Sequence, residues 1–220
     1  MTKVEQLLTS IEKRFKDTVE CKLANGQLTL ELEPSNLLLC AKILRDEAAF
    51  KFNQLIDICG VDYLEYGIGE WATDSATSEG FSRGVVAINA TPAPHEENRF
   101  AVVYHLLSTT LNQRIRLRVF LRGEPPKVPS VIDIWRSADW YEREAFDLYG
   151  IIFDGHTDLR RILTDYGFIG HPFRKDFPLI GQVEMRYDAT ESRVVYEPVS
   201  IEPRTLVPKI IRRTGQTENG

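Results

Sequence analysis

The chain has 220 residues, a formal net charge of −5, 43% hydrophobic residues and 27% charged residues. This balance is typical of a globular protein with enough apolar side chains for a core, and the length fits one sizeable domain with an extension. The negative charge provides no basic surface for nucleic acid, so we expect no nucleic-acid partner. No apolar run approaches the ~18 residues of a membrane span, and the N-terminus predicts no export signal.

The first third of the chain predicts a helix, a hairpin and a second helix. Apolar residues recur at helical spacing over residues 4–15. Asn25-Gly26 lies between two alternating runs and predicts a β-hairpin over residues 18–33. Pro34 ends that hairpin, and the next helix is predicted over Leu37–Asp46.

Strands dominate the middle of the chain, and we predict them over residues 50–66, 85–90, 99–108 and 115–122. Glycine, serine, threonine and acids over residues 67–84 predict a flexible hairpin connection or a loop insertion. The run Phe100–Leu107 lacks alternation, which indicates a central strand that is covered on both faces. Arginines alternate with apolar residues in the last of these strands and predict a basic, half-exposed face.

These elements predict an α+β fold, with a two-layer domain of a mixed β-sheet and helices over residues 1–150. The order of the elements lacks the βαβ alternation of a Rossmann sheet. Gly123–Pro129 contains three prolines and predicts a rigid connector that joins no ladder.

Residues 151–220 predict a long extended C-terminal segment with little regular structure. It contains five prolines and few periodic apolar runs, but it is too aromatic for a disordered tail. Because loops of this length are uncommon in isolated domains, we predict that the segment binds a partner protein.

The stretch Trp140–Gly150 predicts a short helix. Asp139 can serve as its N-cap, with Glu142 completing a capping box, and Gly150 can take the left-handed conformation after the last turn. Taken alone, the stretch indicates an amphipathic helix with a solvated charged face. If the chain beyond it folds back, however, basic residues can meet its acids, and we predict that the charges are shielded in this way: Glu142, Arg143, Glu144 and Asp147 on the helix, and Arg160, Arg161, Arg174 and Lys175 beyond it.

His156 and His171 are the sharpest candidates for chemistry. A metal site formed with Asp158 and Asp176 lacks close ligand spacing, and acid–base catalysis lacks a marked nucleophile or second base. Cysteines are isolated at three positions and form no close pair for zinc or an iron–sulfur cluster, so we expect reduced thiols: Cys21, Cys40 and Cys59. We therefore predict no catalytic, cofactor-binding or metal-binding residue in this chain.

Several blocks of sequence resemble the 30 kDa subunit family of respiratory complex I. Tyr141–Gly150 carries the likeness, together with Gly155-His156, Leu159–Leu163 and Gly170–Leu179, and the similarity covers most of residues 30–180. The resemblance implies a subunit of the peripheral arm of a proton-translocating NADH:quinone oxidoreductase. It further implies a peripheral position on the cytoplasmic side of a bacterial inner membrane, with membrane association through the complex.

The resemblance also implies a non-catalytic structural or assembly role that supports the quinone-reducing module. FMN, iron–sulfur clusters and quinone then belong to other subunits, and the partners are the 49 kDa subunit and the cluster-bearing subunits of the peripheral arm. The interface or structural candidates are Glu142, Arg143, Glu144, Asp147, His156, Arg160, Arg161, His171, Arg174, Lys175 and Asp176. Two alternatives remain open: the equivalent subunit of a membrane-bound hydrogenase or plastid NAD(P)H dehydrogenase-like complex, and a free-standing enzyme that uses His156 and His171.

Overall fold

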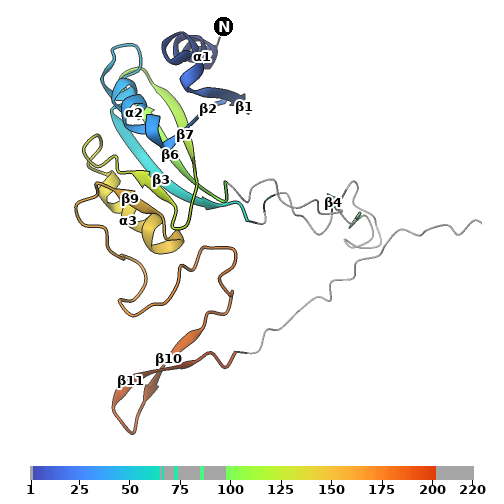
Figure 1. Cartoon of the computed structure of the whole chain (residues 1–220), viewed down its shortest axis with the longest axis vertical. Coiled ribbons are helices and arrows are strands. Elements are labelled where there is room, and N and C mark those ends of the chain that lie inside the picture. The colour runs from blue at the N-terminus through green and yellow to red at the C-terminus, as the bar shows by residue number, and fades with distance from the viewer. Residues whose placement is uncertain (1, 65, 67–71, 74–84, 87–97, 202–220) are drawn as a thin grey trace, which may run out of the picture. The chain divides into compact units, whose positions relative to one another are not determined.

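The computed structural model describes residues 2–64, 66, 72–73, 85–86 and 98–201 (Figure 1). The chain divides into two compact units, the first comprising Met1–Tyr63 with Glu96–Phe177 and the second Leu64–His95 with Pro178–Gly220. Most of the loop predicted over residues 67–84 lies outside the described residues. Within it, Ala72–Thr73 (β4) pairs antiparallel with Val85–Val86 (β5), the start of the next predicted strand. Residues 87–90 of that strand also lie outside the described residues.

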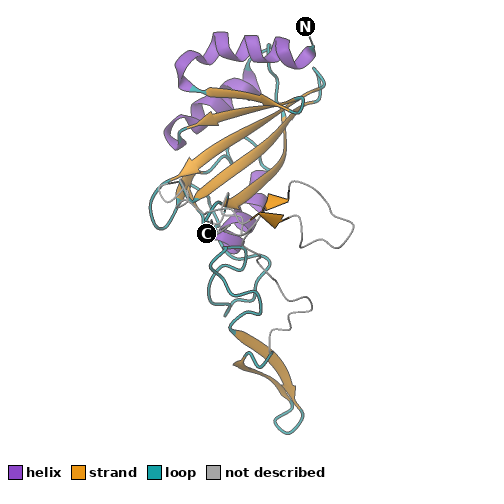
Figure 2. Cartoon of the chain, turned by 90° about the vertical axis from the view of Figure 1, so that its right-hand side faces the viewer, coloured by secondary structure: helices purple, strands orange, loops and turns teal. Residues whose placement is uncertain are grey.

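The first unit combines helices with a mixed sheet, as the sequence predicts (Figure 2). Its elements in chain order are α1 (Lys3–Phe15), β1 (Glu20–Ala24), β2 (Gln27–Leu32), α2 (Leu37–Asp46), β3 (Gln54–Asp62), β6 (Phe100–Ser108), β7 (Gln113–Leu121), β8 (Lys127–Pro129), α3 (Ala138–Tyr149) and β9 (Ile152–Asp154), with 3-10 turns at Lys16–Thr18 and Pro34–Asn36.

Local sequence signals explain the first elements. Thr2 Oγ1 accepts from the Glu5 amide at 3.3 Å, and Glu5 Oε2 accepts from the Thr2 amide at 2.8 Å, so a capping box starts α1. At the turn between β1 and β2, Asn25 and Gly26 have φ values of 51° and 72°. Two successive positive φ angles match the twist of a two-residue hairpin, which explains why this dipeptide occupies the turn.

The main sheet has the strand order β1-β2-β7-β6-β3. All neighbours pair antiparallel except β2 and β7, which are parallel. A parallel pair needs a long connection, and here it contains α2 and the strands β3, β4, β5 and β6. Strand β6 lies inside the sheet and is almost wholly buried, which confirms the predicted central strand. In β7 the buried Leu117 alternates with the half-buried Arg116 and Arg118, as predicted.

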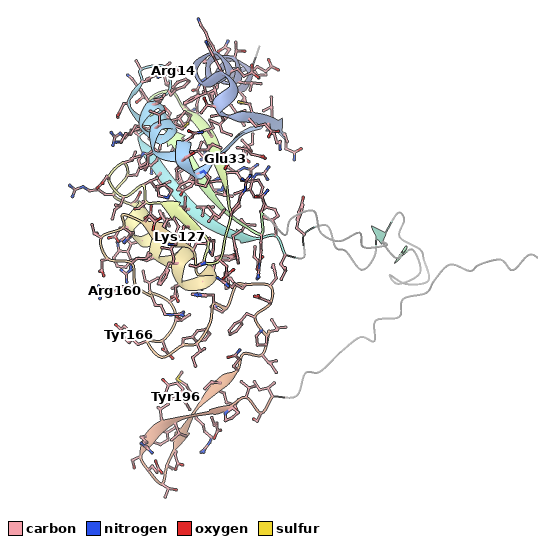
Figure 3. All side chains as sticks on the ribbon, in the orientation of Figure 1. Arg14, Glu33, Lys127, Arg160, Tyr166 and Tyr196 are labelled. Atoms are coloured by element: carbon pink, nitrogen blue, oxygen red, sulfur yellow. The ribbon has the colours of Figure 1, made fainter. Side chains whose placement is uncertain are left out.

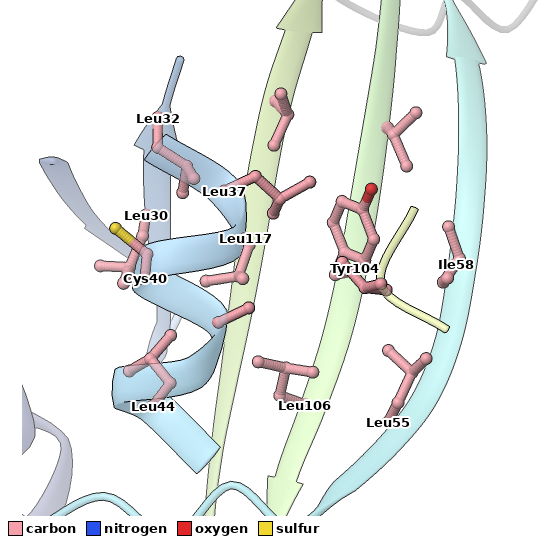
Figure 4. Packing of buried hydrophobic residues seen from close by; sticks show 14 of the residues in the cluster. Leu30, Leu32, Leu37, Cys40, Leu44, Leu55, Ile58, Tyr104, Leu106 and Leu117 are labelled. Carbon is pink, nitrogen blue, oxygen red and sulfur yellow. The ribbon is translucent and has the colours of Figure 1, made fainter. Parts of the chain in front are cut away.

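One hydrophobic cluster joins the helices to the sheet. Figure 4 shows Leu37, Cys40 and Leu44 of α2 beside apolar side chains of β2, β7, β6 and β3, with Tyr104 among them. Full burial of each leucine or isoleucine contributes about 1.5–3 kcal/mol. Cys40 is fully buried and burial raises its thiol pKa to about 11, whereas Cys21 and Cys59 are only half-buried.

Two local predictions near α3 are wrong. The N-cap is Ser137, without a side-chain cap bond, rather than Asp139; Glu142 hydrogen-bonds to residues before the helix instead of closing a capping box. The proline-rich connector does join a ladder, since Lys127–Pro129 (β8) pairs parallel with Ile152–Asp154 (β9). Pro125 and Pro126 precede the paired residues and Pro129 is the last of them, so all three prolines lie at the ends of this two-stranded ladder, where they are tolerated.

The stretch after residue 150 continues the first unit as far as Phe177, so this unit extends beyond the predicted domain boundary. In the second unit, Val183–Asp188 (β10) and Arg193–Pro198 (β11) form an antiparallel hairpin. Binding of residues 151–220 to a partner stays a prediction.

Helix α3 rests on β3 through a glycine. A Cβ atom added at Gly60 would lie 2.5 Å from Cδ2 of Tyr149, far inside contact distance. Gly60→Ala should therefore lower the free energy of unfolding by about 1–3 kcal/mol through overpacking.

The matched control is Gly167→Ala, because nothing lies within 4 Å of its added Cβ. This change should leave stability unchanged or raise it by up to about 1 kcal/mol. Urea unfolding measures both variants; equal stabilities would show that the Tyr149 ring does not rest on Gly60.

Candidate functional site

Asp147 near the end of α3 binds the loop that follows. Its side chain is fully buried and accepts five hydrogen bonds. Oδ2 accepts from the amides of Ile162, Leu163 and Thr164 at 3.0, 2.8 and 2.9 Å. Oδ1 accepts from Arg161 Nη1 at 2.9 Å and from the Thr164 hydroxyl at 2.5 Å. Three consecutive amides directed at one carboxylate form a backbone anion nest.

These donors determine the ionisation of Asp147. Burial by itself raises the pKa of a carboxyl, but the hydroxyl and amide of Thr164 and the amides of Leu163 and Ile162 hold the pKa of Asp147 well below its usual range. The carboxylate is therefore charged throughout the physiological pH range and compensated by the loop.

Two arginines complete this contact. Arg161 also donates to Thr164 Oγ1 at 3.0 Å and to the Gly170 carbonyl at 2.9 Å. Arg143 of α3 donates to the carbonyls of Arg160 and Arg161 at 3.2 and 3.3 Å, and its guanidinium lies over the Trp140 ring. Main-chain acceptors thus engage both guanidinium groups, which stabilises the loop on the helix.

The C-terminal end of α3 binds residues 171–174. His171 Nδ1 donates to the Asp147 carbonyl at 2.8 Å, and Arg174 Nε donates to the Tyr149 carbonyl at 2.7 Å. Burial lowers the pKa of His171, with Arg174 and Arg161 adding to the effect, so the ring is neutral. Gly150 has φ 76°, as its predicted left-handed role requires, and an added Cβ would lie 2.6 Å from His171 Nε2.

The N-terminal half of α3 binds the segment that precedes the helix. Glu142 is fully buried and accepts from the Ser130 hydroxyl at 2.6 Å and the Val131 amide at 2.7 Å. Burial raises its pKa to about 7 even though both hydrogen bonds lower it. His156 lies 4.0 Å from this carboxyl; its Nδ1 accepts from the Asp158 amide at 3.0 Å, and its Nε2 lies 3.3 Å from both the carbonyl and Oδ1 of Asp139.

A second buried carboxylate binds the end of the same loop. Asp62 at the end of β3 forms a bidentate pair with Arg99, at 3.0 and 2.9 Å, and accepts from the Lys175 amide at 2.9 Å. Arg99 also pairs with Asp176 at 3.0 Å. Sequence patterns gave no sign of Asp62 and Arg99, because neither lies in a motif and they are 37 residues apart.

The structure thus brings most of the predicted residues together around α3, but not all in the predicted way. Glu142, Arg143 and Asp147 are buried, so the solvated face that the helix alone suggests is wrong there. Of the acids, only Asp147 meets one of the predicted basic residues, Arg161. Glu144 is exposed, and the Arg160 side chain, labelled in Figure 3, is 63% exposed and pairs with Asp158. Arg174 pairs with Glu124, and Lys175 contributes its amide. A partner contact for any of these residues stays a prediction.

Metal-binding clusters and membrane spans are absent from the described part of the chain. Among those residues no group of three or more His, Cys, Asp and Glu side chains is placed to hold a metal ion. Within the same residues no helix combines the length and the apolarity that a bilayer span requires.

Comparison with known proteins identifies the family. Residues 30–183 match the family described as "Respiratory-chain NADH dehydrogenase, 30 Kd subunit". The chain belongs to this family. A relative from Coxiella burnetii (strain Dugway 5J108-111), named as a subunit of NADH-quinone oxidoreductase, is 57% identical over the full length of both chains. One of the same name from Legionella pneumophila (strain Paris) is 56% identical over 96% of this chain and 94% of its own.

The resemblance to the 30 kDa subunit family is therefore confirmed. A chain in the structure of an archaeal membrane-bound sulfane sulfur reductase shares the fold, with a TM-score of 0.57 and 20% identity over 81% of this chain and 88% of that chain. Helix α3 and the segment that it binds, up to Asp176, lie within the matched residues 30–183.

Asp147→Asn tests the anion nest. The amide group of asparagine would direct a donor at other donors, so the free energy of unfolding at neutral pH should fall by about 3–5 kcal/mol. Glu144→Gln removes an exposed carboxylate from the same helix and should change stability by less than about 0.5 kcal/mol. Denaturant unfolding measures both; an equal, small effect of the two variants would contradict the assignment.

The raised pKa of Glu142 predicts that the free energy of unfolding depends on pH. Its carboxyl is protonated in the folded chain up to about pH 7, whereas in the unfolded chain it ionises at about pH 4.5. Unfolding in this window releases a proton, so stability should fall as pH rises, by up to about 3 kcal/mol.

Glu142→Gln keeps an acceptor for the Val131 amide and removes the titration. Unfolding curves at several pH values for the variant and the original chain give the difference that belongs to Glu142, because the other groups contribute equally to both. Parallel curves across the window would show that Glu142 titrates normally.

Proposed function

We propose that this chain is a non-catalytic structural and assembly subunit in the peripheral arm of a proton-translocating NADH:quinone oxidoreductase, where it supports the quinone-reducing module. The observation that carries the proposal is the use of the charged residues of α3. Asp147 and Arg143 bind the main chain of the loop over residues 160–164, and Glu142 binds the segment before the helix. Because these side chains bind main-chain groups of neighbouring segments, they fix the conformation of the surface that those segments form.

That surface carries apolar side chains. The segment that begins with this loop exposes four large apolar residues over residues 163–173, of which Tyr166 is 97% exposed: Leu163, Tyr166, Ile169 and Phe173. Ordered loops that present apolar side chains to solvent are typical of protein–protein contact sites. The charged network thus provides a firm base for a contact, and this supports an assembly role.

The histidines favour the same role over a free-standing enzyme. The His156 side chain is fully buried; its Nδ1 accepts from the Asp158 amide, and its Nε2 lies 3.3 Å from both the carbonyl and the carboxylate of Asp139. A general acid or base must reach the proton that it transfers in a bound substrate. His171 Nδ1 is engaged by the Asp147 carbonyl. These contacts support a structural role for both rings.

The family supplies the proposed surroundings. We propose that the chain contacts the 49 kDa subunit and the cluster-bearing subunits, on the cytoplasmic side of a bacterial inner membrane. FMN, iron–sulfur clusters and quinone are proposed to belong to those other subunits. The names of the bacterial relatives, at 52–57% identity, favour NADH–quinone oxidoreductase over a membrane-bound hydrogenase or a plastid complex.

Arg161→Met tests the proposal. The change removes the donors to Asp147 and Gly170, so less of the complex should assemble, while the NADH:quinone turnover of each assembled complex should stay near normal. The matched control is Arg122→Met, a 67% exposed arginine paired with Glu33, which should assemble normally.

Purification of the tagged chain from membranes gives the amount of complex, and NADH oxidation by that material gives turnover. Normal assembly with abolished turnover would place Arg161 and the loop that contains it among the catalytic elements and overturn the proposal. A chain that brings down no subunit of the peripheral arm would refute membership of the complex.

A further inference from the structure

The hairpin of β10 and β11 has one entirely apolar face. Residues directly opposite each other in an antiparallel pair project to the same side. The register pairs Val183 with Pro198, Met185 with Tyr196, and Tyr187 with Val194, and these six side chains share one face. Figure 3 labels Tyr196 on the hairpin. Of the six, the five large apolar side chains are each between 52% and 65% exposed.

The opposite face is charged and internally paired. It carries Glu184 opposite Glu197, Arg186 opposite Val195, and Asp188 opposite Arg193. Arg186 pairs with Glu197 at 3.0 Å, and Arg193 pairs with Glu191. A charged face of this kind favours contact with water, so the two faces of the hairpin suit different surroundings.

A two-stranded hairpin with one uncovered apolar face is marginal in water, because independent stability requires a third strand or a surface packed on that face. The composition of the face is also informative. Tyrosine and methionine are enriched at the centres of protein interfaces, where charged residues are depleted.

We propose that this apolar face is a docking surface for another protein of the same complex, and that the partner presents a flat, uncharged apolar patch with polar groups at its rim for the hydroxyls of Tyr187 and Tyr196. The inference rests on the proposed function and deepens it by assigning the face that makes the contact.

The charges of the hairpin argue against a membrane as the occupant. Over residues 183–198 four acids (Glu184, Asp188, Glu191 and Glu197) outnumber two arginines (Arg186 and Arg193), a net charge of −2. Binding to anionic lipid surfaces relies on lysine and arginine beside the apolar residues.

The size of the face argues against a second copy of this hairpin. Six residues per strand span ~20 Å, and two strands are ~5 Å apart. Such a strip is well short of the ~800 Å² per partner that a stable interface buries. The occupant must therefore also contact neighbouring exposed residues such as Leu179 and Ile201, as a larger partner surface can.

Adjacent valines on opposite faces provide a matched pair of variants. Val194→Asp places a charge in the apolar face, and Val195→Asp places the same charge in the polar face. With the full-length chain in its native membranes, Val194→Asp should reduce recovery of the chain with peripheral-arm subunits at least about fivefold. Val195→Asp should leave recovery within about twofold of the original. Urea unfolding of both free chains verifies that the first unit folds normally.

A photoreactive phenylalanine at position 194 or 195 identifies the occupant. The residue at 194 should crosslink to another peripheral-arm subunit, and the residue at 195 should give no such product. Crosslinking at 194 to a second copy of this chain or to lipid, or equal assembly of both aspartate variants, would overturn the inference while leaving complex membership intact. Failure of the original chain to bring down any arm subunit would refute the proposed function itself.

Discussion

The hydrogen bonds that the Asp147 carboxylate accepts are the interactions on which the rest of this structure depends. A buried charge is tolerated only when it is paired and hydrogen-bonded, and here three successive amides, a hydroxyl and a guanidinium satisfy it. Since α3 itself rests on β3 through Gly60 and Tyr149, the loop over residues 160–164 is connected to the central sheet by two consecutive contacts. This connection fixes the position of the exposed Leu163, and the exposed Tyr166, Ile169 and Phe173 follow it in the chain.

Helix α3 carries two buried acids whose pKa values shift in opposite directions. Glu142 and Asp147 are both fully buried on the same helix. Glu142 has two donors, and burial prevails, raising its pKa to about 7. Asp147 has five, and they prevail over burial, so its pKa falls. The first acid joins the helix to the segment before it and the second to the segment after it, which makes α3 the element that unites the C-terminal part of the first unit.

The periodic parts of the structure could be predicted from the sequence. The helix over Leu37–Asp46, the Asn25-Gly26 turn and the central strand all follow from patterns of apolar residues and turn chemistry. Contacts in which a side chain binds main-chain groups far away in the sequence could not be predicted. Glu142 and Glu144 are two residues apart and look alike in sequence, yet one is buried and the other exposed, because a helix turns them to different sides. The first unit extends past residue 150 for a related reason, since a loop held by hydrogen bonds to α3 has no hydrophobic period to reveal its attachment.

Hydrogen exchange of the free chain tests the central claim most directly. The amides of Ile162, Leu163 and Thr164 lie in a loop, and all three donate to the Asp147 carboxylate. At neutral pH these three amides should exchange much more slowly than the amide of the exposed Tyr166, and replacing Asp147 by asparagine should remove the protection while leaving the amides of β6 protected. Fast exchange of all three amides in the original chain, or unchanged protection in the variant, would contradict the account.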